Sequence, residues 1–158
     1  MRVFLSWSGD RGRRLAEALR LWLPDVLQNI TPWVSSEDIE PGLRWSSEIA
    51  SQLQDTKFGI ICVTPESTRA PWLLFEAGAL AKTVTSTYVC PYLFEIDPIE
   101  LKEPLAQFDA VRTDEAGTLK LVRALNRALG PEGQLSDERL RRYFDRWWPD
   151  LRLKLKDI

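Results

Sequence analysis

Short apolar runs alternate with longer amphipathic stretches along the 158-residue chain. The apolar runs have the length and the β-branched and aromatic content that is typical of strands. The third of them is apolar almost throughout, which indicates a central parallel strand buried on both faces. Pro32 indicates that the second begins irregularly or lies near an edge of its sheet. The predicted strands are Val3–Trp7, Ile30–Val34, Lys57–Thr64, Tyr88–Ile96 and Ala110–Arg112.

Between these runs, apolar residues recur at spacings of three and four, which predicts helices. The first helix begins near Asp10, and we expect Pro24 to kink or end it. We expect Ser136 to cap the last helix, which runs through Trp148. The other predicted segments are helices over Trp45–Leu53, Pro71–Val84 and Leu119–Leu129, and a short helix or turn over Pro98–Phe108.

Strands that alternate with helices of this length indicate βαβ units with right-handed crossovers. We therefore predict an α/β fold: a flavodoxin-like, doubly wound, five-stranded parallel sheet with helices on both faces. Residues 1–130 form the predicted domain, and residues 131–158 form a C-terminal helical extension of it. Ligands of such sheets bind beyond the carboxyl ends of the strands, so the loops at residues 7–11, 35–45, 64–72 and 95–98 are candidates for a site.

The absence of histidine from the whole sequence restricts the possible chemistry more than any other feature of the composition. It excludes Ser-His-Asp and Cys-His catalysis and every histidine metal site, and we predict no bound metal. Cys62 and Cys90 lie inside apolar runs, so we expect free buried thiols and a cytoplasmic protein. The net charge of −2 argues against direct nucleic-acid binding. The chain has no apolar run long enough for a membrane span, and its strand-like start leaves no room for a signal peptide.

Residue types at the predicted loops separate the flavodoxin-like families. The third strand ends in Val63-Thr64-Pro65-Glu66 and lacks the aspartate of a phosphoacceptor receiver domain. The loop after the first strand, Ser6-Trp7-Ser8-Gly9-Asp10-Arg11, is too short and too acidic for the phosphate cradle of a flavodoxin. It also lacks the cysteine of a low-molecular-weight tyrosine phosphatase. These three families are therefore poor matches.

Three other segments carry a resemblance. They are Phe4-Leu5-Ser6-Trp7-Ser8-Gly9-Asp10, Glu37-Asp38-Ile39-Glu40-Pro41-Gly42 with Trp45, and Ser67 followed by Trp72-Leu73-Leu74-Phe75-Glu76. In this order they resemble the first strand, the BB loop and the W-x-x-x-E helix of the toll/interleukin-1 receptor (TIR) domain family. The sequence Trp72-Leu73-Leu74-Phe75-Glu76-Ala77-Gly78-Ala79 is more similar to bacterial TIR proteins of antiphage defence than to animal signalling adaptors.

Similarity to catalytic TIR domains implies cleavage of the bond between nicotinamide and ribose in NAD+, with Glu76 as the catalytic residue. NAD+ is then a substrate, and no cofactor is expected. The chemistry suits a carboxylate, because loss of neutral nicotinamide leaves positive charge on the ribose, which a fixed anion stabilises. The alternative for Glu76 is a solvated acid in the first turn of a helix.

We assign substrate binding to residues at strand ends and on the loops that follow: Ser6, Trp7, Arg11, Trp33, Asp38 and Trp72. Arg11 could meet a pyrophosphate or simply be solvated, and Trp72 could wall the site or belong to the core. Ile39, Pro41, Gly42 and Trp45 are assigned to self-association through the BB loop, with packing that anchors the loop as the better explanation for Trp45.

Two other functions remain open from sequence alone. One is a TIR module that only binds proteins, and the other is an enzyme similar to nucleoside deoxyribosyltransferases. The Asp38-Ile39-Glu40-Pro41-Gly42 loop argues against the second, and Glu76 favours an enzyme over a pure adaptor. These 158 residues show no sensor, so we expect either a separate sensor or activating subunit, or a chain that is a fragment of a longer protein.

Overall fold

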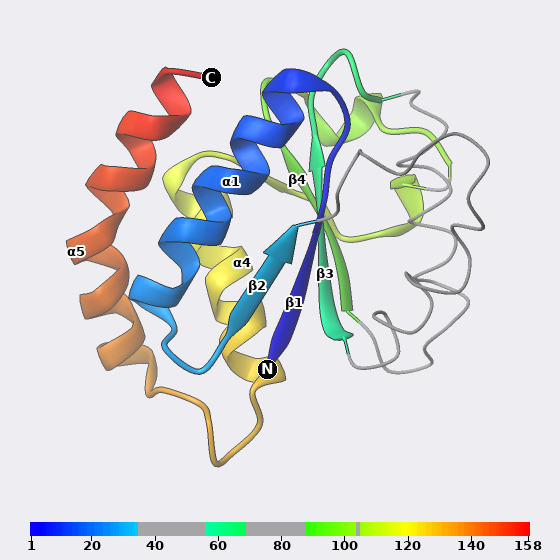
Figure 1. Cartoon of the computed structure of the whole chain (residues 1–158). Coiled ribbons are helices and arrows are strands. Elements are labelled where there is room, and N and C mark those ends of the chain that lie inside the picture. The colour runs from blue at the N-terminus through cyan, green and yellow to red at the C-terminus, as the bar shows by residue number, and fades with distance from the viewer. Residues whose placement is uncertain (35–55, 69–87, 104) are drawn as a thin grey trace.

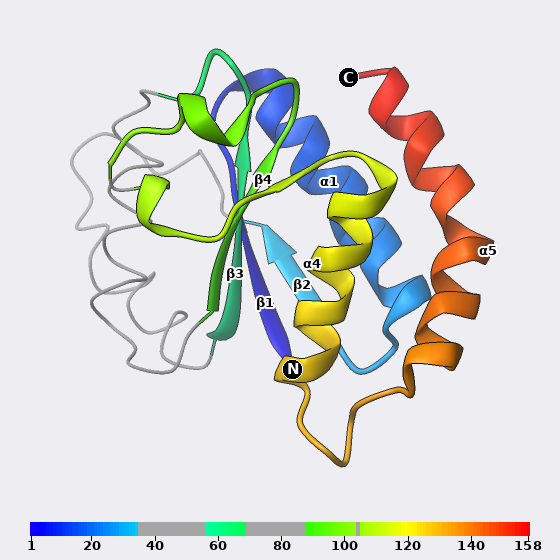
Figure 2. The same ribbon diagram turned by 180° about the vertical axis from the view of Figure 1, so that it is seen from behind.

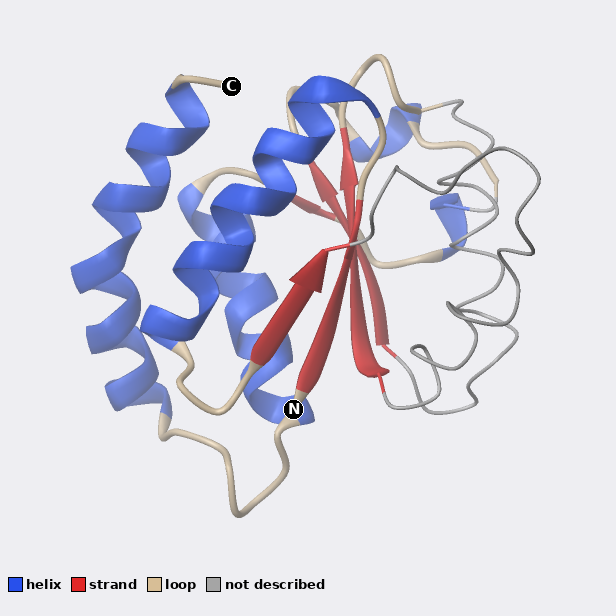
Figure 3. Cartoon of the chain, in the orientation of Figure 1, coloured by secondary structure: helices blue, strands red, loops and turns tan. Residues whose placement is uncertain are grey.

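The computed structural model describes residues 1–34, 56–68, 88–103 and 105–158. Its centre is a parallel sheet with the strand order β2-β1-β3-β4-β5 (Figure 1, Figure 3). This is the flavodoxin-like order, so the predicted fold class is confirmed. The strands are β1 (Arg2–Ser6), β2 (Thr31–Val34), β3 (Thr56–Val63), β4 (Tyr88–Leu93) and β5 (Val111–Arg112).

The long helices of the described residues lie on one side of the sheet. Helices α1 (Gly9–Val26) and α4 (Glu115–Ala128) cover this face, and α5 (Asp137–Lys156) packs outside them (Figure 1, Figure 2). The short 3-10 helices η1 (Pro98–Glu100) and η2 (Leu105–Gln107) lie on the opposite side. The predicted helices over residues 45–53 and 71–84 lie outside the described residues.

The sheet buries apolar side chains on both faces, because successive residues of a strand point to opposite sides. Ile60 and Cys62 belong to the large core beneath α1 and α4. Ile61 and Val63 belong to a second cluster with Leu105 of η2. The central position predicted for the third strand is therefore confirmed, as is the burial of both free cysteines.

The predicted end of the last helix is wrong, and Pro24 does not end the first helix. Helix α1 passes Pro24 and ends at Val26. Helix α5 continues past Trp148 to Lys156, although Pro149 lies inside it. A proline in a helix interior costs about 3 kcal/mol. Beyond Pro149 the helix buries Leu151 and Leu155, and each buried leucine contributes roughly 1.5–3 kcal/mol, which is enough to offset that cost.

The position of β2 agrees with the prediction, whereas β4 is shorter than predicted. Strand β2 lies at one edge, as Pro32 indicated. Strand β4 ends at Leu93 rather than at Ile96. Its extension is stopped near Glu95, which has a φ of 56° and so lies in the left-handed region.

No helix within the described ranges combines the length and the apolar character that a membrane span requires.

Candidate functional site

Charged side chains from three segments meet at the carboxyl edge of the sheet. Arg11 lies in the first turn of α1, Glu66 follows β3 and Glu95 follows β4. One guanidinium nitrogen of Arg11 donates to Glu66 Oε1 at 2.7 Å, and another donates to Glu95 Oε2 at 2.5 Å. We call these residues the Arg11 cluster.

Electrostatics within the Arg11 cluster favour the charged forms. The hydrogen bond from Arg11, followed by one from the Thr64 side chain, lowers the pKa of Glu66 to about 2. The two glutamates in turn raise the pKa of Arg11, with Glu95 the larger cause. The side chains are 29–62% exposed, so solvent screens these ion pairs and each contributes little to stability. The cluster carries one excess negative charge.

The chain is bent at Glu95 so that its carboxylate reaches Arg11. A non-glycine residue in the left-handed region costs of order 1 kcal/mol. The neighbouring Phe94 is buried, and the Arg11 guanidinium lies 4.9 Å from the centre of its ring. Buried Phe94 and the ion pair together hold this turn. The sequence analysis did not include Glu66 and Glu95 among the candidate site residues. Their positions shortly after the third and fourth strands, at the carboxyl edge, could have identified them.

The two expectations for Arg11 are contact with a pyrophosphate and simple solvation. In this structure its guanidinium is already held by two carboxylates. A pyrophosphate that bound here would have to displace them.

Ser6 and Trp7, the first pair predicted to bind substrate, are both buried and point to opposite sides of the sheet. Trp7 is 5% exposed and belongs to the core under α1. Its Cβ lies 3.6 Å from the position of a Cβ built on Gly12. Ser6 is fully buried and pairs with Ile61 of β3, which faces the second core cluster.

Trp33 lies on the same face of the sheet as Ser6. Its ring centre is 4.4 Å from that of Phe4, and the guanidinium of Arg2 lies 5.3 Å from the ring. The indole Nε1 is buried and has no hydrogen-bond acceptor among the described residues. A buried donor of this kind is costly unless something accepts from it. The structure therefore separates Trp33 and Ser6 from Trp7.

The remaining predicted site residues lie outside the described residues. They are Glu76, Trp72 and Asp38 of the proposed substrate site, and Ile39, Pro41, Gly42 and Trp45 of the BB loop. Within the described ranges, no group of three or more aspartates, glutamates or cysteines is placed to hold a metal ion. Burial raises the pKa of both thiols, that of Cys90 to about 12, so neither is a reactive thiolate at neutral pH.

The fold and its charged carboxyl edge define a flavodoxin-like α/β domain whose ligands are expected at that edge. The family profile of the TIR domain matches residues 3–122, which is well over half of the chain. The chain therefore belongs to the TIR-domain family. A comparison with curated protein sequences gives no match. The matched range ends inside α4, so α5 lies beyond it.

Proposed function

We propose that this TIR domain is an NAD+ glycohydrolase or cyclase that cleaves the nicotinamide–ribose bond, with Glu76 as the catalytic residue. The observation that carries the proposal is the Trp72-Leu73-Leu74-Phe75-Glu76 segment, which lies inside the range matched to the TIR domain. The residues 72 and 76 are four apart, a spacing that puts two side chains on one face if the segment is helical.

The reaction requires little acid–base chemistry from the protein. Nicotinamide leaves as a neutral molecule, and positive charge develops on the ribose as the bond breaks. A fixed carboxylate stabilises that charge, and its oxygens can also accept hydrogen bonds from the ribose hydroxyls. A protein without histidine can therefore carry out this reaction.

Two features of the described residues support an NAD+ site. The Arg11 cluster has an excess negative charge at the carboxyl edge, which suits a substrate with a cationic nicotinamide ring. The buried Nε1 of Trp33 has no acceptor among the described residues and is a donor that a ligand oxygen could satisfy. Of the other expected substrate-binding residues, Arg11 lies at this edge, whereas Ser6 and Trp7 are buried on opposite sides of the sheet. Asp38 and Trp72 lie outside the described residues and stay proposals.

The proposed setting is the cytoplasm of a bacterium, as an effector or signal-producing subunit in antiphage immunity. We propose self-association through Ile39, Pro41, Gly42 and Trp45, and activation by a separate sensor subunit. The product is ADP-ribose, linear or cyclised. Family membership equally accommodates a module that only binds other TIR domains. It gives no support to a nucleoside deoxyribosyltransferase.

Release of nicotinamide from NAD+ by concentrated pure protein tests the activity. We expect the wild type to release nicotinamide and Glu76→Gln to lose at least about a hundred-fold in rate, as removal of a charge-stabilising group typically causes. Glu103→Gln is the control, because Glu103 is an exposed acid with no ion pair among the described residues. It should keep wild-type activity.

The alternatives give different results in this assay. A folded wild type that releases no nicotinamide at any concentration, but still self-associates, would identify an interaction module. Equal turnover by wild type and Glu76→Gln, with unchanged circular dichroism, would show that another group is catalytic.

A further inference from the structure

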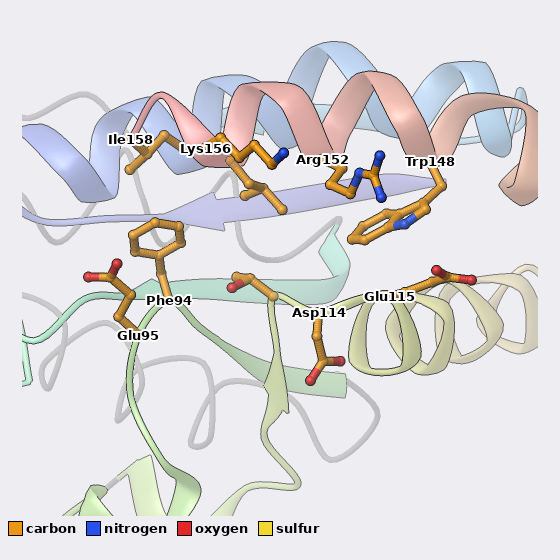
Figure 4. Close-up of a pocket in the computed structure, with 10 residues that line it drawn as sticks. Phe94, Glu95, Asp114, Glu115, Trp148, Arg152, Lys156 and Ile158 are labelled. Carbon is orange, nitrogen blue, oxygen red and sulfur yellow. The ribbon is translucent and has the colours of Figure 1, made fainter.

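A cavity of about 540 Å³ lies between the C-terminal half of α5 and the carboxyl ends of β4 and β5 (Figure 4). Its volume is within the range of small-molecule sites. One wall belongs to α5, which lies outside the range matched to the TIR domain. The other wall comes from the matched part of the chain. We call this cavity the α5 pocket.

The α5 wall presents one aromatic ring and two cations. Trp148, Arg152 and Lys156 are four residues apart and therefore share one stripe of the helix, about 12 Å long. Figure 4 shows this stripe across from Phe94, Glu95 and Glu115, while the carboxylate of Asp114 points away from α5. Phe94 and Trp148 line the pocket but are only 7% and 8% exposed, while Arg152 and Lys156 are exposed.

The two cations have no charged or hydrogen-bonding partner of their own among the described residues. Neither Arg152 nor Lys156 forms an ion pair or hydrogen bond within the part of the chain that the structure describes. By contrast, Arg141 of the same helix pairs with Asp145 at 2.7 Å. The positive charge on the pocket wall is therefore available to an anion.

Each acid across the pocket already has a polar partner of its own, and the three acids of the lining outnumber its two cations. Glu95 is bound by Arg11 at 2.5 Å. Asp114 caps α4 by accepting from the Gly117 N–H at 2.7 Å, and Glu115 lies 3.5 Å from Arg141. Each carboxylate still has lone pairs that can accept from a hydroxyl or amino donor.

We propose that the α5 pocket binds a nucleoside monophosphate or a nucleotide of similar size. Its phosphate would contact Arg152 and Lys156, its base would lie against Phe94 or Trp148, and its ribose hydroxyls would donate to the acids of the opposite wall. In this arrangement the base meets the aromatic residues of the pocket, the ribose hydroxyls meet its carboxylates, and the phosphate meets its two cations.

AMP is the probe, because it has no nicotinamide–ribose bond and its binding can be measured whether or not the protein cleaves NAD+. Calorimetry would compare the wild type with the double variant Arg152→Gln/Lys156→Gln. The control is Arg139→Gln/Lys154→Gln, which removes the same charge from exposed positions of α5 outside the pocket.

We expect AMP to bind the wild type and the control alike, and Arg152→Gln/Lys156→Gln to weaken AMP binding about ten-fold or more. Adenosine should bind the wild type about ten-fold more weakly than AMP and should not distinguish the variants. Amide NMR shifts on adding AMP should concentrate at residues 113–115 and 148–156. All positions substituted are exposed, and thermal unfolding checks that each variant is folded.

Four results would overturn the proposal. The first is that AMP does not bind the wild type at millimolar concentration, and the second is that the wild type binds AMP and adenosine with equal affinity. The third is that AMP binds the wild type and Arg152→Gln/Lys156→Gln with equal affinity. The fourth is that both double variants weaken AMP binding equally. The last would show that AMP responds only to net charge.

Discussion

At the scale of single residues, the Arg11 cluster shows how an exposed ion pair can matter more for position than for stability. Arg11 joins the segments that follow β3 and β4 by two short hydrogen bonds. Exposed pairs of this kind contribute under about 1 kcal/mol. They fix instead where the carboxylates of Glu66 and Glu95 lie at the carboxyl edge of the sheet.

The pKa of Glu66 gives a test of that pairing. Its folded-state pKa is about 2, below the ordinary 4.5, so the unfolded chain takes up the proton first as pH falls. The stabilisation by Glu66 is therefore fully present above about pH 4.5 and is lost as pH falls towards 2. We expect Glu66→Gln to lower the free energy of unfolding by up to about 1 kcal/mol at pH 7, and by progressively less below pH 4.5.

Urea unfolding of both proteins between pH 2 and pH 7 measures this difference. Glu103→Gln, which removes an exposed acid with no ion pair among the described residues, should give no comparable pH-dependent difference. A stability difference for Glu66→Gln that stayed constant down to pH 2 would show that the pairing does not exist in solution.

Sequence reasoning placed Arg11 at the carboxyl edge but could not find its partners. Arg11 is in contact with residues that are 55 and 84 positions away, and no local pattern carries that information. Trp7 illustrates the same limit, since a tryptophan after a strand suits either a site or a core, and this one is buried beneath α1. The assignments of Glu76 and Trp72 rest on their motif and stay predictions.

At the scale of elements, the start of α4 is packed tightly against β5. A Cβ added at Gly117 would lie 2.2 Å from the Arg112 carbonyl oxygen and 2.8 Å from the Arg112 nitrogen. Both are backbone atoms, so the helix itself would have to move. We expect Gly117→Ala to destabilise the protein by about 2 kcal/mol or more, measured by urea unfolding.

Gly12 in α1 is the matched control for Gly117. Its added Cβ would make ordinary contacts, the nearest at 3.6 Å to Trp7 Cβ. Alanine is favoured over glycine in a helix by about 1 kcal/mol, so Gly12→Ala should be neutral or stabilising. If Gly117→Ala were tolerated equally well, the close approach of α4 to β5 would be contradicted.

Helix α5 is an integral layer of the fold. Its buried stripe consists of Leu140, Phe144, Trp148, Leu151 and Leu155. Phe144 is fully buried and meets Trp22 of α1 edge to face, with 5.9 Å between ring centres. The Trp22 indole also donates to the Trp147 carbonyl oxygen at 2.7 Å. These contacts join α5 to α1, although the helix lies beyond the range matched to the TIR domain.

Two substitutions on α5 test this role. Phe144→Ala removes a buried ring and should lower the free energy of unfolding by about 3–5 kcal/mol. Leu153 is 60% exposed on the same helix, so Leu153→Ala should stay within about 0.5 kcal/mol of the wild type. Chemical denaturation measures both. Similar small effects would mean that α5 is only loosely attached.

At the scale of the whole molecule, the sheet was predictable because each strand has its own apolar pattern. The nearly continuous apolar run of β3 predicted its central position, and Pro32 allowed an edge position for β2. The length of α5 was not predictable in the same way. The last helix was expected to run through Trp148, while the helix continues to Lys156 and buries Leu151 and Leu155 beyond that point.

The BB-loop residues were assigned to self-association of the protein. Ile39 is an apolar side chain in an otherwise polar segment, and Gly42 follows Pro41. If this loop of one copy completes the site of the next, specific NADase activity must rise with protein concentration. Gly42→Pro would fix φ and remove a backbone donor at that loop. We expect this variant to fold, to stay monomeric and to be nearly inactive.

Nicotinamide release over a range of protein concentrations, with light scattering on the same samples, measures both properties. Glu103→Gln should associate and turn over like the wild type, because it changes an exposed acid outside the loop. Specific activity that does not depend on concentration would show that each molecule has a complete site. A fully active Gly42→Pro monomer would lead to the same conclusion, since such a site would need nothing from the BB loop of a neighbour.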